Sequence, residues 1–116
     1  MTILAKVYSE NHQKNPYTRV LCKGDPEIIK KLLKEVPQNY EECYKKWGNK
    51  GYKVLALAYN NNEKFEYNTK RKELEKDLIF CGFLIVETPH KYNVNKYISE
   101  LVKAKYDICI ITGDQL

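Results

Sequence analysis

The sequence predicts an α/β (α+β) fold, in which an antiparallel sheet is flanked by helices and the chain ends in a βαβ unit. Three observations predict it. Short apolar or β-branched segments alternate along the chain with segments whose apolar residues recur at the period of a helix. The first two strand-like segments enclose a polar turn, which is typical of a hairpin. The last two enclose a helical stripe, which is typical of a parallel crossover.

The first two elements are predicted to form a hairpin followed directly by a helix. Residues 2–8 and 17–22 are rich in β-branched side chains, and the residues between them are polar. After Lys23-Gly24 comes Asp25-Pro26-Glu27, in which the aspartate can cap a helix, the proline suits its first position and the glutamate favours its positive end. A helix therefore begins here.

Two consecutive helices and a third strand are expected next. The first helical stripe ends at Pro37, which breaks the pattern, and the second ends near Gly48. The stripes comprise Ile29, Leu32, Leu33 and Val36, then Tyr40, Cys43, Tyr44 and Trp47. The spacing of the aromatic residues favours core packing over a ligand platform. Residues 52–59 then alternate as a strand does.

The second half of the chain is predicted as a loop at 60–68, a short charged helix at 71–76, and the βαβ unit. Residues 78–86 are apolar on both faces, as expected of a strand in the middle of a covered sheet. A helical stripe at 94–102 precedes a buried strand at 108–111. Ligands of such units gather at the carboxyl ends of the strands, where Thr112-Gly113-Asp114 follows.

Composition limits the classes of protein to consider. The 116 residues suit one domain, and the longest apolar run covers about half of the roughly 20 residues that a membrane-spanning helix needs. No secretory signal is recognised, and the four cysteines lack the spacing of a zinc site. Three of the four fall within apolar strand-like runs, where we expect small core residues in reducing surroundings. The net charge of +5 favours an anionic partner without choosing between phosphate and nucleic acid.

Three short motifs carry possible chemistry. Lys23-Gly24 lies between a strand and a capped helix, where an ammonium and a backbone without Cβ could meet a flat or anionic ligand. Lys53 begins a strand, where its cation could meet phosphate oxygens. The Thr112-Gly113-Asp114 turn could offer backbone N–H groups and a hydroxyl to phosphate, and a carboxylate to a ribose or to the water shell of magnesium. Each motif taken alone is most simply a turn glycine or a surface lysine.

The order of these motifs resembles that of P-type ATPases. That family has, in this order, Lys-Gly-x-Pro-Glu, Arg-x-Leu-Ala-Leu-Ala, Asp-Leu-x-Phe-x-Gly, a proline hinge and Thr-Gly-Asp-Asn. The corresponding segments here are Lys23-Gly24-Asp25-Pro26-Glu27, Lys53-Val54-Leu55-Ala56-Leu57-Ala58, Asp77-Leu78-Ile79-Phe80-Cys81-Gly82, Thr88-Pro89-His90-Lys91 and Thr112-Gly113-Asp114-Gln115. Thr88-Pro89-His90, together with residues 82–86, is more similar to the type V subfamily of the endoplasmic reticulum and endolysosomal membranes.

The resemblance implies a role for each matching residue. Lys23 and Gly24 would line the adenine pocket, and Lys53 would replace the arginine that contacts the nucleotide phosphates, with loss of its bidentate geometry. Thr112, Gly113 and Asp114 would reach the nucleotide from the phosphorylation domain. Residues 1–87 would then be part of the nucleotide-binding domain, and residues 88–116 the hinge and the start of the phosphorylation domain.

The resemblance also implies the activity of a larger protein. Its ligands would be ATP and Mg²⁺, and it would couple ATP hydrolysis, through an aspartyl-phosphate, to cation transport. The chain lacks the Asp-Lys-Thr-Gly-Thr segment that accepts the phosphoryl group, so alone it is expected to be inactive, soluble and monomeric. Its partners would be the phosphorylation, actuator and membrane domains of the same polypeptide, at the cytosolic face of a membrane such as the endoplasmic reticulum.

Two other functions remain open from sequence. A small basic module could use its 20 Lys+Arg and 10 Tyr to bind nucleic acid, although the tyrosines are expected mostly at core-like positions. A structural or interaction domain could also keep the fold without binding nucleotide. Binding to a single-stranded oligonucleotide with a steep salt dependence would favour the nucleic-acid module.

Overall fold

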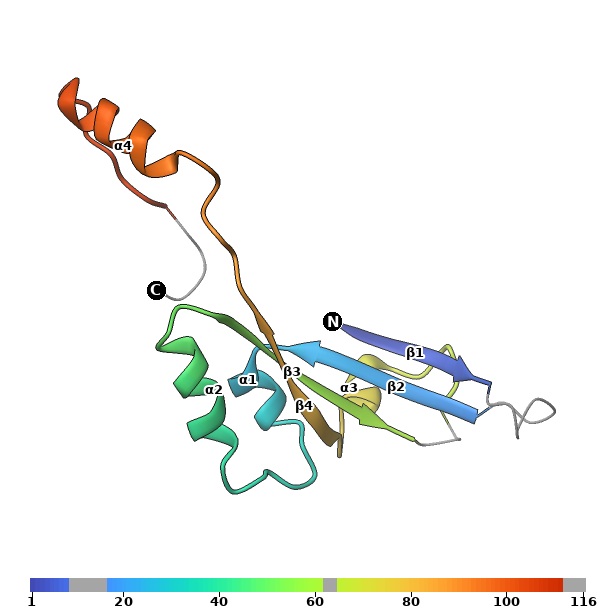
Figure 1. Ribbon diagram of the computed structural model, residues 1–116. Coiled ribbons are helices and arrows are strands. Elements are labelled where there is room, and N and C mark those ends of the chain that lie inside the picture. Colours follow the sequence, from blue (N-terminus) through green and yellow to red (C-terminus); the bar gives the residue numbers. More distant parts are fainter. Residues whose placement is uncertain (9–16, 62–64, 112–116) are drawn as a thin grey trace.

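The protein folds around one four-stranded antiparallel sheet (Figure 1). The computed structural model describes residues 1–8, 17–61 and 65–111. The strands lie side by side in chain order and are β1 (Thr2–Val7), β2 (Tyr17–Gly24), β3 (Lys53–Asn60) and β4 (Ile79–Val86). The hairpin predicted at the start of the chain is confirmed, with Thr2 opposite Cys22 and Val7 opposite Tyr17. The turn predicted between its strands lies largely outside the described residues.

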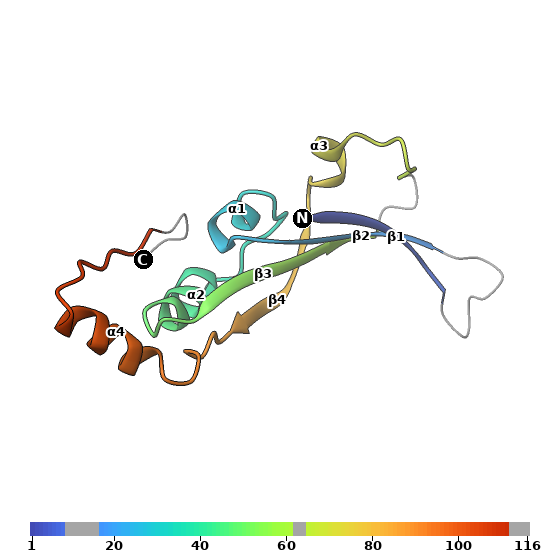
Figure 2. The same cartoon turned by 90° about the horizontal axis from the view of Figure 1, so that it is seen from above.

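Four helices are described, and they are α1 (Pro26–Lys30), α2 (Tyr40–Gly48), α3 (Arg71–Leu74) and α4 (Val94–Lys103). Helices α1 and α3 lie on the same side of the sheet (Figure 2). The predicted cap of α1 is confirmed, since the Asp25 carboxylate accepts hydrogen bonds from the backbone N–H groups of Glu27 and Ile28, at 2.8 and 3.3 Å. An ion pair of 2.5 Å from Lys30 to Glu41 joins α1 to α2.

The core lies between α1, α2 and one face of the sheet. Strands β2 and β3 bury alternate residues there, as the period of a half-buried strand requires. The buried residues are Val20, Cys22, Ile29, Tyr40, Ala56, Ala58 and Leu78. Tyr40 packs its ring against Phe80 and Phe83, with centroids 4.9 and 4.8 Å away, and donates a hydrogen bond of 2.9 Å to the carbonyl of Pro26. This face is called the helix face below.

Helix α1 is shorter than its apolar stripe suggested. Helix α1 ends at Lys30, and Leu33 instead forms an isolated parallel bridge with Leu78. The backbone N–H of Leu78 donates a hydrogen bond to the Leu32 carbonyl, and the backbone N–H of Lys34 donates one to the Leu78 carbonyl, both at 2.9 Å. The predicted extension of the first helix to residue 36 is therefore wrong, because these residues satisfy their backbone groups against the start of β4.

Two predictions about strands are also wrong. Among the described residues β4 is an edge strand and not a central one. Residues 106–111 form no strand, and Ile110 and Ile111 are 85% and 93% exposed, so the expected βαβ unit is not formed. An apolar segment becomes a strand only where another strand can pair with it, and the chain between β4 and α4 leads away from the sheet (Figure 1).

The cysteines differ from expectation as well. Cys22 is a core residue, whereas Cys43, Cys81 and Cys109 are exposed. Cys81 has no partner residue on β3, because the register shifts there between Gly82 and Phe80, and Cys109 lies in the segment that forms no strand.

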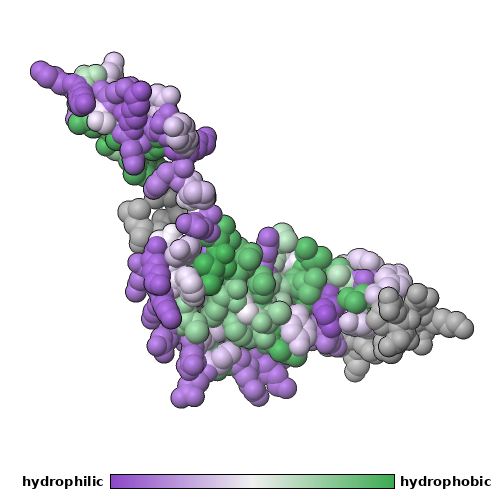
Figure 3. Space-filling model, viewed as in Figure 1, coloured by the Kyte–Doolittle hydropathy of each residue, from purple (hydrophilic) through white to green (hydrophobic). Residues whose placement is uncertain are grey.

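The face of the sheet opposite the helices, called the open face below, is apolar and exposed. Leu21, Ile79 and Leu84 are each between 43% and 44% exposed there. The apolar residues whose register assigns them to this face are Ile3, Leu21, Leu55, Leu57, Ile79, Leu84 and Val86. Figure 3 shows the hydrophobic surface that gathers over the strands.

Candidate functional site

Lys23 lies near the end of β2 and belongs to the open face. Its neighbour Cys22 is buried on the helix face, and successive residues of a strand alternate between faces. The backbone of Lys23 is fixed by β1, since its N–H donates to the Met1 carbonyl at 2.9 Å and the Met1 amino group donates to the Lys23 carbonyl at 2.7 Å. The Lys23 side chain is exposed, and it forms no ion pair with a described residue.

Lys53 is the first residue of β3 and belongs to the same face as Lys23. Lys23 lies opposite Leu57, and Lys53 lies four residues before Leu57 on the same strand, so the two lysines share one face. Strand rise and strand spacing place their Cα atoms about 14 Å apart. The structure therefore brings these two predicted site residues to one end of one surface.

The surface between the two lysines is apolar. Leu55 and Leu57 are half-buried and alternate with the buried Ala56, so they form its floor. Leu57 lies opposite Gly82, and a Cβ built at Gly82 would meet nothing within 4 Å. A shallow, uncharged area beside Lys23 results, of the kind that a flat ring could cover.

Electrostatics at this end of the sheet favour an anion. None of the four strands contains an aspartate or a glutamate, so Lys23 and Lys53 share the open face with no acidic strand residue. Asp25 is the nearest acidic residue along the chain to Lys23, and its carboxylate accepts hydrogen bonds from the first turn of α1. The Asp25 carboxylate is thus engaged in capping α1.

Gly24, the second residue of the Lys23-Gly24 motif, belongs to the other face of the sheet. It lies on the helix face, where an added Cβ would come within 3.4 Å of the Ile29 Cδ1 atom. Any contribution of Gly24 to a ligand on the open face is therefore confined to its backbone. The other three predicted site residues, Thr112, Gly113 and Asp114, lie outside the described residues.

Arg19 is a further polar residue of the open face, and the sequence reasoning missed it. Its guanidinium carbon lies 5.1 Å from the centroid of the Tyr17 ring and 5.3 Å from that of Tyr59, and its Nε donates to the Asn61 Oδ1 atom at 2.7 Å. The alternation of Tyr17, Arg19 and Leu21 along one strand was a signal for this shared face.

The tyrosines are less buried than the sequence suggested. Tyr40 is 2% exposed and belongs to the core, whereas the other nine are half-buried or exposed. The most exposed are Tyr8, Tyr67, Tyr92, Tyr97 and Tyr106. They come from separate segments of the chain and line no common strand or helix, unlike the tyrosines of a base-stacking platform.

Comparison with known proteins assigns most of the chain to one family. The sequence profile described as P-type ATPase, cytoplasmic domain N, matches residues 1–93. A Schizosaccharomyces pombe protein named endoplasmic reticulum transmembrane helix translocase is 38% identical over 102 residues, which cover 84% of this chain and 8% of that protein.

Two further relatives come from a plant and an animal. The Arabidopsis thaliana protein named probable manganese-transporting ATPase PDR2 is 36% identical over 97 residues, covering 80% of this chain and 8% of the relative. The human protein named probable cation-transporting ATPase 13A5 is 30% identical over 123 residues, covering 100% of this chain and 10% of the relative. The chain thus spans 8% to 10% of the length of these three relatives.

In the described ranges, no helix combines the length and the apolar composition that crossing a bilayer requires.

The relatives include type V P-type ATPases, the subfamily that residues 82–90 resemble. With the profile matching residues 1–93, the chain belongs to the P-type ATPase family and is a fragment of its cytoplasmic N domain.

Proposed function

We propose that the end of the open face that carries Lys23 and Lys53 binds ATP, in a P-type ATPase that couples hydrolysis through an aspartyl-phosphate to transport across a membrane. The observation that carries the proposal is the placement of two lysines on one face, separated by the apolar floor of Leu55 and Leu57. The adenine base needs an apolar surface, and the triphosphate needs cations. The open face offers both, since the apolar floor lies between the two lysines.

The proposed orientation follows from the neighbours of each lysine. The adenine ring lies over Leu57 and Gly82, beside the Lys23 ammonium, because Leu57 offers an apolar surface and Gly82 has no side chain to obstruct it. The phosphates extend along β3 toward Lys53, whose single cation replaces the arginine of the family motif. Mg²⁺ accompanies the phosphates and reduces their charge. Lys23 and Lys53 hold and orient the nucleotide, and neither transfers a proton.

The proposed division of the chain follows its architecture. Residues 1–87 form part of the nucleotide-binding domain, and residues 88–116 form the hinge and the start of the phosphorylation domain. In support, α4 exposes Tyr97, Ile98 and Leu101, and the chain before it is extended (Figure 1). We propose that this stripe and residues 108–111 pack into the phosphorylation domain of the whole protein, where a βαβ unit can form. Thr112, Gly113 and Asp114 would there approach the nucleotide.

The rest of the whole protein is part of the same proposal. The exposed apolar area of the open face beyond the lysines is then covered by other parts of the N domain, and the remaining partners are the actuator and membrane domains. Three of the relatives bear names that include the endoplasmic reticulum, and we propose the cytosolic face of that membrane as the location. The isolated fragment, without the phosphorylated aspartate, is proposed to bind nucleotide without hydrolysing it.

An ATP titration of the isotope-labelled chain, followed by amide shifts, tests the proposal. We expect a dissociation constant on the order of 1 mM, or about −4 kcal/mol, because much of the pocket belongs to other segments. Lys23→Ala should weaken binding by about threefold to tenfold, since it removes one partly exposed charge contact. Lys31→Ala, at the exposed end of α1, is the matched control and should leave the affinity unchanged.

The outcomes separate the functions left open by the sequence. Shifts that gather away from Lys23 and Lys53, or a Lys23→Ala variant that binds as the wild type does, would contradict the site. Tight, strongly salt-dependent binding of a single-stranded oligonucleotide would favour the nucleic-acid module instead.

A further inference from the structure

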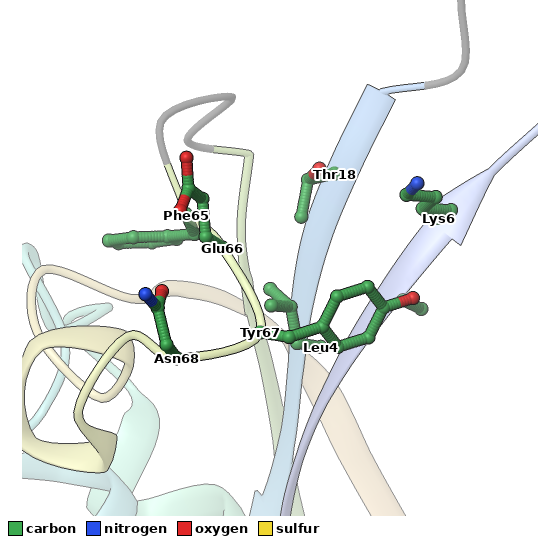
Figure 4. A pocket seen from close by; sticks show the side chains of 8 residues that line it. Leu4, Lys6, Thr18, Phe65, Glu66, Tyr67 and Asn68 are labelled. Carbon is green, nitrogen blue, oxygen red and sulfur yellow. The ribbon is translucent and has the colours of Figure 1, made fainter.

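A cavity lies on the helix face of the sheet, at the opposite end from Lys23. Its volume is about 480 Å³, which is within the usual range for small-molecule sites. Strands β1 and β2 form one wall, and the segment before α3 forms the other (Figure 4). The lining residues are Leu4, Ala5, Lys6, Thr18, Phe65, Glu66, Tyr67 and Asn68.

The inner walls of this cavity are apolar and partly aromatic. Leu4 lies opposite the buried Val20, and both Leu4 and Phe65 pack against the core. In Figure 4 the Tyr67 ring extends toward the strands, and the Phe65 ring extends away from them. Two aromatic residues and one aliphatic residue therefore give the cavity an apolar lining that suits a flat apolar body.

The mouth of the cavity carries a cation and neutral donors. Lys6 and Thr18 lie opposite each other on β1 and β2, so their side chains are neighbours on the helix face. The Lys6 Nζ atom lies 6.0 Å from the centroid of the Tyr67 ring and has no carboxylate partner among the described residues. An anionic group at the mouth would meet the Lys6 ammonium and the Thr18 hydroxyl together.

The segment that carries Tyr67 is fixed by its own turn. The Glu66 N–H donates to the Thr69 hydroxyl, and the Thr69 N–H donates to the Glu66 carbonyl, each at 2.9 Å. Tyr67 and Asn68 therefore lie at the tip of a closed turn. The Tyr67 side chain is itself 80% exposed, so its ring is available to a ligand.

The charge of the lining limits the ligand to a monoanion. Glu66 lies on the opposite side of the cavity from Lys6 (Figure 4), and the two charges sum to zero. A ligand with several negative charges, such as a triphosphate, would meet one cation and one carboxylate and would gain little. A single carboxylate placed at Lys6 avoids Glu66.

We propose that this cavity binds a small aromatic carboxylate, with its ring against the apolar lining that includes Leu4, Phe65 and Tyr67, and its carboxylate at Lys6 and Thr18. The site is separate from the proposed nucleotide site because Lys6 and Thr18 belong to the helix face, whereas Lys23 and Lys53 belong to the open face. The two sites can therefore be tested independently in the same chain.

Binding of 2-naphthoate to the full chain, followed by amide shifts, tests the proposal. We expect a dissociation constant on the order of 1 mM, with shifts at Leu4, Thr18 and Phe65. Lys6→Gln should weaken binding by about threefold to fivefold, as should replacing the probe by the neutral 2-naphthamide. Lys34→Gln, which removes a lysine remote from the cavity lining, is the matched control and should change nothing.

Other outcomes overturn the proposal. These are an absence of shifts at the cavity, equal affinities for naphthoate and naphthamide, or equal effects of Lys6→Gln and Lys34→Gln. Displacement of naphthoate by ATP would show that the two ligands share one site and would also reject it. Binding of a peptide with an aromatic side chain, but not of naphthoate, would assign the cavity to a protein partner instead.

Discussion

At the scale of residues, strand alternation decides which side chains can act together. Lys23 and Gly24 are adjacent in sequence, yet one belongs to the open face and the other packs at Ile29 on the helix face. Lys23 and Lys53 are 30 positions apart and share a face. The two residues of a motif such as Lys-Gly therefore face opposite sides of the sheet, and only the lysine side chain can meet a ligand on the open face.

Tyr40 makes the stability of the fold depend on pH in the alkaline range. Burial, with the nearby Tyr44 and Asp25 adding to it, raises the pKa of Tyr40 from 10.0 to about 12. The neutral phenol is therefore favoured in the folded state, and its contribution is complete below pH 10 and declines as the pH rises from 10 toward 12.

A comparison of urea unfolding between wild type and Tyr40→Phe measures this effect. The variant should be less stable by about 1 to 2 kcal/mol below pH 10, because the Pro26 carbonyl loses its donor. The difference should shrink as the pH rises toward 12, since only the wild type carries the phenol. A difference that stays constant over this range would contradict the assignment.

At the scale of elements, β4 is held in place by the residue just before it, Leu78, and by the side chains on its helix face. Leu78 is fully buried and bridges to Leu33, whereas the next residue, Ile79, is 44% exposed on the open face. These two adjacent large aliphatic residues form a matched pair for mutation.

Leu78→Ala should lower the free energy of unfolding by about 3 kcal/mol, because it leaves a cavity in the core. Ile79→Ala should lower it by less than about 1 kcal/mol, since that side chain is largely in water. Urea unfolding of both variants measures the difference. Equal losses would mean that the open face is as well packed as the helix face.

The sequence predicted some of these elements well and others poorly, for physical reasons. The hairpin and the α1 cap depend on local signals, namely β-branched runs and the Asp25-Pro26 pair, and both are present. The stripe from Ile29 to Val36 has the period of a helix, but the bridge between Leu33 and Leu78 joins residues 45 positions apart, which no local pattern encodes.

The candidate site was predictable in part for the same reason. Motif order identified Lys23 and Lys53, and the alternation of each strand fixes its two faces. The pairing of Lys23 with Leu57, which brings the lysines to one surface, depends on the register of β2 against β3. Register is a tertiary property here, since α1 and α2 lie between these strands in sequence.

At the scale of the whole molecule, the chain has a folded body and an extended arm. The body contains the sheet and the core, while α4 lies beyond an extended segment with its apolar stripe exposed (Figure 1). The domain boundary proposed near residue 88 would lie at the start of this extended segment.

Removal of residues 88–116 should therefore leave the body intact. We expect the melting temperature of the 1–87 fragment to lie within about 3 °C of that of the full chain, because no core residue is removed. Thermal unfolding followed by circular dichroism measures this. A fragment that fails to fold would place the arm within the body's core and would reject the boundary.

Binding of Mn²⁺·ATP, followed through the methyl signals of leucine and valine, tests the shared nucleotide surface most directly. Leu55 and Leu57 should broaden strongly, whereas Val20, buried on the helix face, should broaden least. Because the metal accompanies the phosphates, Leu55, nearer Lys53, should broaden more than Leu57. Stronger broadening of Val20 than of Leu55 and Leu57, or broadening that is unaffected by Lys23→Ala and Lys53→Ala, would contradict the account.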